Sequence, residues 1–290
     1  MTTVSATAAP AAEGGFLARH HFLLRRLHSL SGIVPIGLFV CFHLFTNMQM
    51  ILGDFQHEVD WIHSQPAVLL LEIFGIWLPI AFHAGLGIVY TFTGKPNTGV
   101  YGYSDNWRYT FQRITGIIAL IFIFYHVATL RWRWNLGDWS TPFFTYAVGA
   151  NPDGQTVPFA MQATAIAVQH SIAVLLLYIV GVLAVTYHFA NGVWTAAISW
   201  GLTLTQAAQR RFGYVCIVIF LGLIGCGAAA LYSAWTYHVT EADWADYART
   251  KVLYQQTGIA PEKGQAFPYM AEQVGPDQYE YKFMTPAKAH

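Results

Sequence analysis

The sequence is poor in charge. Only 10% of its 290 residues are Asp, Glu, Lys or Arg, and 15 basic residues balance 15 acidic ones. Soluble domains usually carry about 25% charged residues. Because charged side chains are costly in lipid, the deficit indicates a protein that crosses a membrane several times. The zero net charge also lacks the basic footprint of nucleic-acid binding, so we expect no nucleic-acid partner.

Cysteine is scarce as well. The three cysteines, Cys41, Cys216 and Cys226, lie in apolar runs, and no CxxC or CxxCH motif occurs. This excludes a zinc ribbon and a covalently attached c-type haem. The N-terminus lacks a basic region followed by an apolar one. We therefore interpret residues 1–21 as a disordered cytoplasmic N-terminus and not as a signal peptide.

Long apolar runs are abundant, since 55% of the residues are hydrophobic. A membrane-spanning helix needs roughly 20 such residues. The sequence therefore predicts an all-α membrane protein whose five transmembrane helices form a bundle. The predicted spans are 27–51, 67–93, 112–130, 163–191 and 212–236. The apolar segment 193–204 either extends the fourth span or lies flat in the membrane interface.

The basic residues predict the orientation, because cytoplasmic loops are enriched in Lys and Arg. One side of the predicted bundle receives Arg19, Arg25, Arg26, Lys95, Arg108, Arg113, Arg210 and Arg211. The loops of the other side hold only Arg131 and Arg133, against Asp54, Glu58, Asp60, Asp138 and Asp153. We expect a multi-pass protein of the plasma (inner) membrane, with a cytoplasmic N-terminus and an extracytoplasmic C-terminal extension, 237–290.

Four predicted spans each carry one histidine near the end of the span. His43 and His126 lie late in spans that run outward, and His83 and His188 lie late in spans that run inward. The spans therefore sort the histidines into an outer pair and an inner pair. Ionisable residues inside membranes are rare and usually functional. Two imidazole pairs at two depths are what two stacked haems with bis-histidine ligation require.

Several motifs then resemble one known family. They are RRLHSLSG (25–32), LEIF (71–74), LPIAFHAGLGIVY (78–90), QRITGIIALIFIFYHV (112–127), YIVGVLAVTYHFANGVW (178–194) and SWGLTLT (199–205). Over about residues 22–235 the chain resembles the five-helix dihaem cytochrome b anchors of succinate:menaquinone and menaquinol:fumarate oxidoreductases. The family's four axial ligands match His43, His83, His126 and His188.

The resemblance implies an electron-transfer subunit with two b haems and no dicarboxylate site of its own. Its expected partners are a flavoprotein (FAD) subunit, an iron–sulfur subunit, membrane lipid and menaquinone, with a higher oligomer of the complex as a further option. The implied function is transfer of electrons from the iron–sulfur subunit through both haems to menaquinone. The alternatives are a menaquinol:fumarate reductase anchor or the cytochrome b subunit of another respiratory complex.

Polar residues at the cytoplasmic ends of spans one and three are candidate contacts of the inner haem propionates or the iron–sulfur partner. A guanidinium suits a carboxylate because its planar fork donates two parallel hydrogen bonds. Positive-inside anchoring explains the arginines equally well. The candidates are Arg25, Arg26, His28, Ser31, Gln112 and Arg113.

Two further residues are candidates for a quinone site near the outer haem. Glu72 is the only acidic residue in a predicted span, and on a straight helix it shares a face with His83, about 16 Å further outward. A buried carboxylate can relay protons to quinone, although a purely structural role is an equal alternative. His170 precedes His188 by five whole helical turns, so it could replace His126 or His43 as a ligand of the outer haem, or line the quinone site. The resemblance favours His43 and His126 as the ligands.

The C-terminal extension departs from the family. A short helix is predicted over 241–255, and Pro261, Pro268, Pro276 and Pro286 break any longer one. The aromatic content suggests that the extension packs on the outer loops, a neighbouring protomer or the quinone entrance, with disorder as the alternative.

Two rival functions remain open at this stage. Cytochrome b anchors of hydrogenases and nitrate reductases often carry two histidines on one helix, whereas here each helix supplies one. A haem-free transport or structural protein could instead line a proton path with its histidines, and an absorption spectrum separates that case.

Overall fold

The computed structural model of the chain describes residues 15–95, 98–149, 156–261, 269–275 and 278–283. Most of the predicted disordered N-terminus lies outside these ranges, as do Asp153, Pro268, Pro276 and Pro286. The part that is described is helical, because α1 covers Phe16–Arg19 and α2 begins at His21. The order predicted to start at residue 22 therefore begins earlier.

Five helical segments are long and apolar enough to cross a membrane, as the sequence predicts. They run over His21–Ile51, Val68–Thr93, Ser104–Arg131, Ile172–Ser199 and Gln206–Thr236. The first comprises α2 (His21–Ile33), α3 (Pro35–Met48) and the short helix η1 (Gln49–Ile51); the second comprises α5 (Val68–Glu72), the π-helical turn η2 (Ile73–Trp77) and α6 (Leu78–Thr93). The third comprises α7 (Ser104–His126) and a second π-helical turn, η3 (Val127–Arg131); the others are α9 (Ile172–Ser199) and α10 (Gln206–Thr236).

The fourth span differs from its predicted range of 163–191. The apolar run is divided into α8 (Ala160–Gln169) and α9, because Ser171 takes an extended backbone conformation with φ −157° and ψ 157°. Its hydroxyl accepts a hydrogen bond from the Val174 amide at 3.2 Å, which caps the new helix. At the other end α9 continues to Ser199, so most of 193–204 extends the span.

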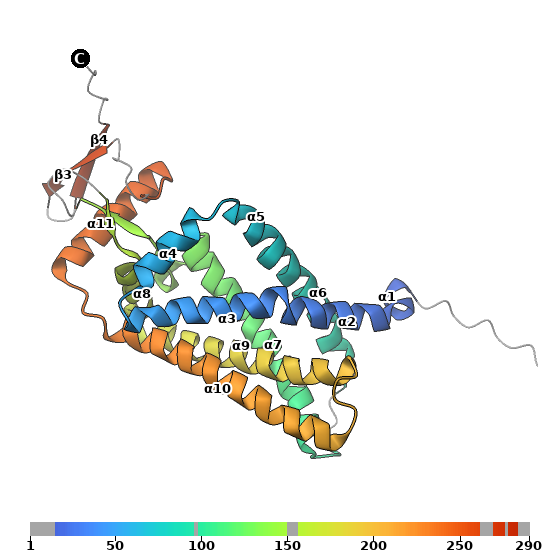
Figure 1. Cartoon of the computed structure of the whole chain (residues 1–290). Helices are drawn as coiled ribbons and strands as arrows, with labels where there is room; N and C mark the ends of the chain where they lie inside the picture. The colour runs from blue at the N-terminus through green and yellow to red at the C-terminus, as the bar shows by residue number, and fades with distance from the viewer. Residues whose placement is uncertain (1–14, 96–97, 150–155, 262–268, 276–277, 284–290) are drawn as a thin grey trace, which may run out of the picture.

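Helix α9 lies at the centre of the bundle, where it packs against α7 and α10 (Figure 1). Helix α10 also packs on α3, and α2 packs on α6. Large apolar side chains such as Phe124 and Leu221 point outward and are more than half exposed. An apolar outer surface is expected of helices that face lipid, since association in a membrane depends on packing and not on hiding apolar groups from water.

A compact group of smaller elements covers one end of the bundle, opposite to α1 (Figure 1). We refer to α4 (Phe55–Ser64), α8, α11 (Glu241–Thr257) and the hairpin β1–β2 (Tyr146–Val148 and Thr156–Pro158) as the cap. The two strands are antiparallel, with Ala147 opposite Val157. A short helix, η4 (Gly137–Trp139), precedes them, and a second antiparallel hairpin, β3 (Tyr269–Gly275) and β4 (Gln278–Phe283), follows α11. The fold is thus mostly helical, with two small hairpins that the all-α prediction lacks.

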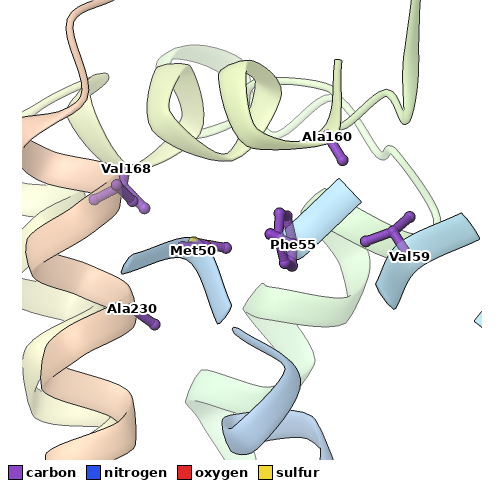
Figure 2. Packing of buried hydrophobic residues seen from close by; sticks show 7 residues of the cluster. Met50, Phe55, Val59, Ala160, Val168 and Ala230 are labelled. Carbon is purple, nitrogen blue, oxygen red and sulfur yellow. The ribbon is translucent and has the colours of Figure 1, made fainter. Parts of the chain in front are cut away.

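Two apolar clusters hold the cap together and attach it to the bundle. Figure 2 shows the first, in which α4, η1, α8 and α10 contribute side chains. Its buried members are Met50, Phe55, Val59, Ala160, Val168, Ala230 and Ala234. The second joins α11 to the hairpin β1–β2 and α8 through Phe144, Ala147, Phe159, Ala163, Ile166 and Tyr247.

The helix predicted over 241–255 is confirmed as α11. Thr240 and Asp243 form a capping box, in which the Thr240 hydroxyl accepts from the Asp243 amide and the Asp243 carboxylate accepts from the Thr240 amide. The helix ends at Gly258, which adopts the left-handed conformation at φ +68° that favours glycine. Tyr247 of α11 packs against the hairpin β1–β2 and α8, so this segment contacts the loops at its own end of the bundle.

Candidate functional site

The bundle brings together the histidines that the sequence pairs. His43 of α3 and His126 of α7 have ring centroids 5.7 Å apart, and the planes of the rings are inclined by 77°. His83 of α6 and His188 of α9 have centroids 6.1 Å apart, with planes inclined by 90°. We call these the outer pair and the inner pair. All four side chains are partly buried.

The two pairs lie at different levels of the bundle. The Tyr178 ring of α9 contacts His126 of the outer pair at a centroid distance of 5.7 Å. His188 of the inner pair lies ten residues further along the same helix, which is about 15 Å at 1.5 Å per residue. The helices therefore separate the two imidazole pairs along the bundle axis.

Main-chain carbonyls hold both imidazoles of the inner pair. His83 Nδ1 lies 2.9 Å from the His28 carbonyl oxygen, and His188 Nδ1 lies 2.9 Å from the Gln112 carbonyl oxygen. A carbonyl only accepts hydrogen bonds, so Nδ1 of each ring carries the proton. The remaining nitrogen, Nε2, then has a free lone pair, and this is the form of histidine that binds metal ions.

Side chains hold the outer pair. His126 Nδ1 lies 3.3 Å from the Tyr178 hydroxyl. The Asn47 side-chain nitrogen donates to the His43 carbonyl at 2.7 Å and lies 3.5 Å from His43 Nε2. Neither Tyr178 nor Asn47 was singled out from the sequence. A hydroxyl or amide inside an apolar span, at the level of a paired histidine, is the signal that would have identified them.

The donor set fits haem iron. No group of three or more His, Cys, Asp or Glu side chains with metal-binding geometry occurs in the described ranges, so each pair supplies two ligands only. Bis-histidine ligation of haem requires only two protein ligands, because the porphyrin supplies the other four ligands of the iron. Two rings on opposite sides of one metal ion have centroids about 6 Å apart, since the metal–nitrogen bond is about 2.0 Å. Both pairs match this separation.

Two glycines allow the inner imidazoles to lie directly against neighbouring helices. A Cβ atom placed on Gly116 of α7 would lie 2.9 Å from His188 Cε1. One placed on Gly32 of α2 would lie 2.8 Å from His83 Nδ1. Any larger residue at either position would displace the ring.

Several polar groups surround the inner pair on α2 and α6. The His28 ring stacks on the His83 ring with centroids 3.9 Å apart, and its edge faces Tyr90 at 5.4 Å. The Arg25 guanidinium lies 5.3 Å from the centre of the Tyr90 ring. In the described part of the chain, His28 Nδ1 and the Tyr90 hydroxyl are buried without a hydrogen-bond partner. Unpaired buried polar atoms of this kind fit a polar ligand group, such as a carboxylate.

The other predicted inner-end residues make different contacts. Arg113 donates to the Tyr90 carbonyl at 2.7 Å, which places its guanidinium beside this cluster. The Arg26 guanidinium lies 4.3 Å above the Phe22 ring and 5.4 Å from the centre of the Trp200 ring. The Ser31 hydroxyl donates to the His28 carbonyl at 2.9 Å.

Gln112 is engaged with the ligand helix α9. Its amide nitrogen donates to the His188 carbonyl at 3.1 Å, and its amide oxygen accepts from Asn191 at 2.7 Å. Its main-chain carbonyl also holds His188 Nδ1. Gln112 therefore fixes the rotation of His188, and Asn191, which the sequence did not single out, supports it.

Glu72 forms a bidentate ion pair with Arg131 near α4, at the end of the bundle that the cap covers. Arg131 Nε donates to Glu72 Oε1 at 3.2 Å, and its terminal nitrogen donates to Oε2 at 2.8 Å. The π-helical turn η2 separates Glu72 from His83, so the expectation that they share one face of a straight helix is wrong. The turn η3 ends at Arg131, so both partners of the ion pair adjoin a π-helical turn.

His170 does not share a face with His188. The five-turn spacing assumes one continuous helix, and the break at Ser171 places His170 at the end of α8 with an exposed side chain.

His63 of α4 lies close enough to the Glu72–Arg131 ion pair for both charges to affect its pKa. Burial lowers its pKa, and the Arg131 guanidinium lowers it further, against a smaller opposing effect of Glu72. This imidazole is therefore neutral at pH 7.

Comparison with known proteins identifies the family. No family model matches the chain. The chain is 39% identical over 214 residues to the succinate dehydrogenase cytochrome b558 subunit of Bacillus subtilis, and the alignment covers 73% of this chain and 96% of that protein. The family predicted from the motifs is thereby confirmed. This relationship and the five apolar helices agree, and the chain belongs to the family of membrane-anchor cytochrome b subunits of succinate dehydrogenase.

Proposed function

We propose that this subunit carries electrons from an iron–sulfur subunit through two b haems to menaquinone, within a complex whose flavoprotein subunit oxidises succinate. The observation that supports it most is the presence of two imidazole pairs at two levels, each with ring centroids about 6 Å apart. When bound, the haems would supply one-electron transfer across the bundle. The protein's own residues bind, orient and insulate them.

His83 and His188 would hold the haem that is nearer to the iron–sulfur subunit, and His43 and His126 the other. The carbonyls of His28 and Gln112 keep Nε2 of the inner ligands unprotonated and correctly directed. Arg25, Arg113 and the His28–Tyr90 pair are the groups we assign to the inner propionates, because they converge at one place with unpaired polar atoms. Arg26, which lies over the Phe22 ring, is the residue we assign to the iron–sulfur partner.

The quinone site we propose lies at the outer end, beside Glu72 and Arg131. Reduction of a quinone to a quinol consumes two protons, and a carboxylate next to the quinone oxygen can deliver them. The Arg131 guanidinium holds the Glu72 carboxylate in place through two hydrogen bonds. The neutral imidazole of His63 can take up protons from the outer solvent. His170 is left out because its supposed alignment with His188 depends on a helix that is interrupted.

The orientation in the membrane belongs to the same proposal. The starts of α2, α7 and α10 lie at the end of the bundle away from the cap (Figure 1). These segments carry six arginines: Arg25, Arg26, Arg108, Arg113, Arg210 and Arg211. The positive-inside rule assigns that end to the cytoplasm and the cap to the extracytoplasmic side.

Haem analysis of the purified complex tests the proposal. A pyridine haemochrome assay of the wild type should give two b haems per chain, with two midpoint potentials in a redox titration. His83→Ala should remove one haem and interrupt succinate-dependent quinone reduction, and His43→Ala should remove the other.

His57→Ala is the matched control. His57 is an exposed histidine of α4 and belongs to neither pair, so this variant should keep both haems. Retention of two haems in His83→Ala, or a single haem in the wild type, would contradict the proposal.

A further inference from the structure

The ring nitrogens of the two pairs are held by different chemical groups. Both inner imidazoles donate from Nδ1 to amide carbonyls at 2.9 Å. His126 of the outer pair instead faces the hydroxyl of Tyr178 at 3.3 Å. A phenol oxygen is a weaker hydrogen-bond acceptor than an amide carbonyl, because its lone pair is delocalised into the ring. The two pairs therefore differ in the group that faces Nδ1, and this group sets the basicity of the axial ligand.

Packing fixes the position of the Tyr178 side chain. Only 8% of its surface is exposed. The Phe122 ring meets it edge-on at 5.3 Å, and Phe122 in turn lies against Gly181, where a side chain would collide with its ring. Phe122 lies on α7 and Gly181 on α9, so the packing of these two helices holds the Tyr178 ring in place.

The Tyr178 hydroxyl faces the ring nitrogen of His126 that would not bind iron. Its oxygen lies 3.3 Å from His126 Nδ1. Ligation through Nε2 requires a neutral imidazole that carries its proton on Nδ1. The Tyr178 oxygen then accepts the hydrogen bond from Nδ1.

We propose that Tyr178 is the positioning residue of the outer axial ligand: its oxygen accepts the Nδ1 proton of His126, directs Nε2 of that ring towards the iron, and sets the potential of the outer haem separately from that of the inner haem. This inference depends on the proposed function only in requiring that His126 ligates a haem. Tyr178 itself touches neither substrate nor iron in this role.

Redox titration of the Tyr178→Phe variant in the assembled complex is the test. The substitution keeps the ring that packs on Phe122 and removes only the acceptor. His126 then donates less electron density to the iron, which disfavours the oxidised state, so the midpoint potential of the outer haem should rise. A tenfold change in the relative affinity of the ligand for the two oxidation states corresponds to about 59 mV. The inner haem should keep its wild-type potential.

Tyr125→Phe is the matched control. Tyr125 is a neighbouring tyrosine of α7 whose hydroxyl donates to the Trp139 carbonyl at 2.6 Å and faces no histidine nitrogen in the described structure. Its removal should leave both potentials unchanged. Phe122→Leu provides a second variant in case Tyr178→Phe does not assemble. It removes the edge-on contact that holds the Tyr178 ring beside His126, so the hydrogen bond weakens and a smaller rise of the outer potential should follow.

The possible outcomes separate the two proposals. Unchanged outer potentials in Tyr178→Phe, or an equal shift of both haems, would overturn the role of Tyr178 while the wild type still shows two haems. If the Tyr178 variant does not assemble, an unchanged outer potential in Phe122→Leu would overturn it as well. A wild-type complex without two b haems would overturn the proposed function together with this inference.

Discussion

The chemistry of the candidate site depends on what each functional side chain contacts. A neutral imidazole is a ligand for iron only if its other nitrogen holds the proton, and the carbonyls of His28 and Gln112 impose that state on the inner pair. Contacts and exposure also decide what Glu72 can do. Its side chain is 22% exposed and that of Arg131 is 57% exposed, so the pair is open to water and to a small ligand.

Glu72→Gln should slow quinone reduction at least tenfold, because an amide keeps the shape of the side chain but cannot carry a proton to the quinone. Both haem spectra should stay unchanged. The measurement is succinate-dependent reduction of a soluble quinone by the purified complex. Glu58→Gln, the same change on α4 at the outer end, should retain wild-type turnover. Normal turnover in Glu72→Gln would remove this residue from the proton path.

At the scale of the elements, the ends of the helices are decided by single polar residues. Ser171 divides one apolar run into α8 and α9. Thr240 starts α11 and thereby allows Tyr247 to reach the second cap cluster.

Arg133 also helps to attach α11, since its guanidinium lies 5.2 Å from the centres of both the Phe144 and Tyr254 rings. Burial among these groups lowers the pKa of Arg133.

Thr240→Ala should destabilise α11 by about 1 kcal/mol, because the capping box loses its side-chain acceptor. The expected result is faster cleavage of the C-terminal extension in limited proteolysis, with unchanged haem spectra. Thr236→Ala, which removes a hydroxyl that donates to the Tyr232 carbonyl at the end of α10, is the control. Equal cleavage rates in Thr240→Ala and the wild type would show that the cap does not depend on this box.

The whole molecule is asymmetric along its long axis. The cap occupies one end, and α1 and the connection between α9 and α10 occupy the other (Figure 1). The candidate propionate-binding residues lie towards the second end and the Glu72–Arg131 pair towards the first. The direction of electron flow that we propose therefore depends on which end faces the cytoplasm.

Cysteine labelling in intact cells tests this orientation. Leu52, which precedes α4, is 65% exposed, and Leu202, in the connection between α9 and α10, is 78% exposed. A maleimide that cannot cross membranes should label Leu52→Cys in intact cells and Leu202→Cys only after lysis. The native chain is the control for its three cysteines, which lie within helices. The reverse pattern would invert the proposed topology.

Much of the fold could be predicted because a membrane imposes one dominant requirement. A run of apolar residues long enough to cross it must form a helix, since the main-chain polar groups find no water there. The five spans and the pairing of the four histidines follow from this requirement and from the alternating direction of the chain. Hydrophobicity alone predicts one helix across Ser171, because the apolar run continues on both sides of it. The capping hydrogen bond that divides the run is not visible in that pattern.

The sequence by itself determined the five helices, the family and the imidazole pairs, because apolar length and span order are properties of a chain read in one dimension. Only the tertiary structure decided which groups surround these residues: the Arg131 partner of Glu72, the Tyr178 hydroxyl beside His126 and the attachment of α11 to the hairpin β1–β2. These contacts join positions far apart in the chain. They depend on helix rotation, which two π-helical turns and one capped break alter by amounts that periodicity cannot express.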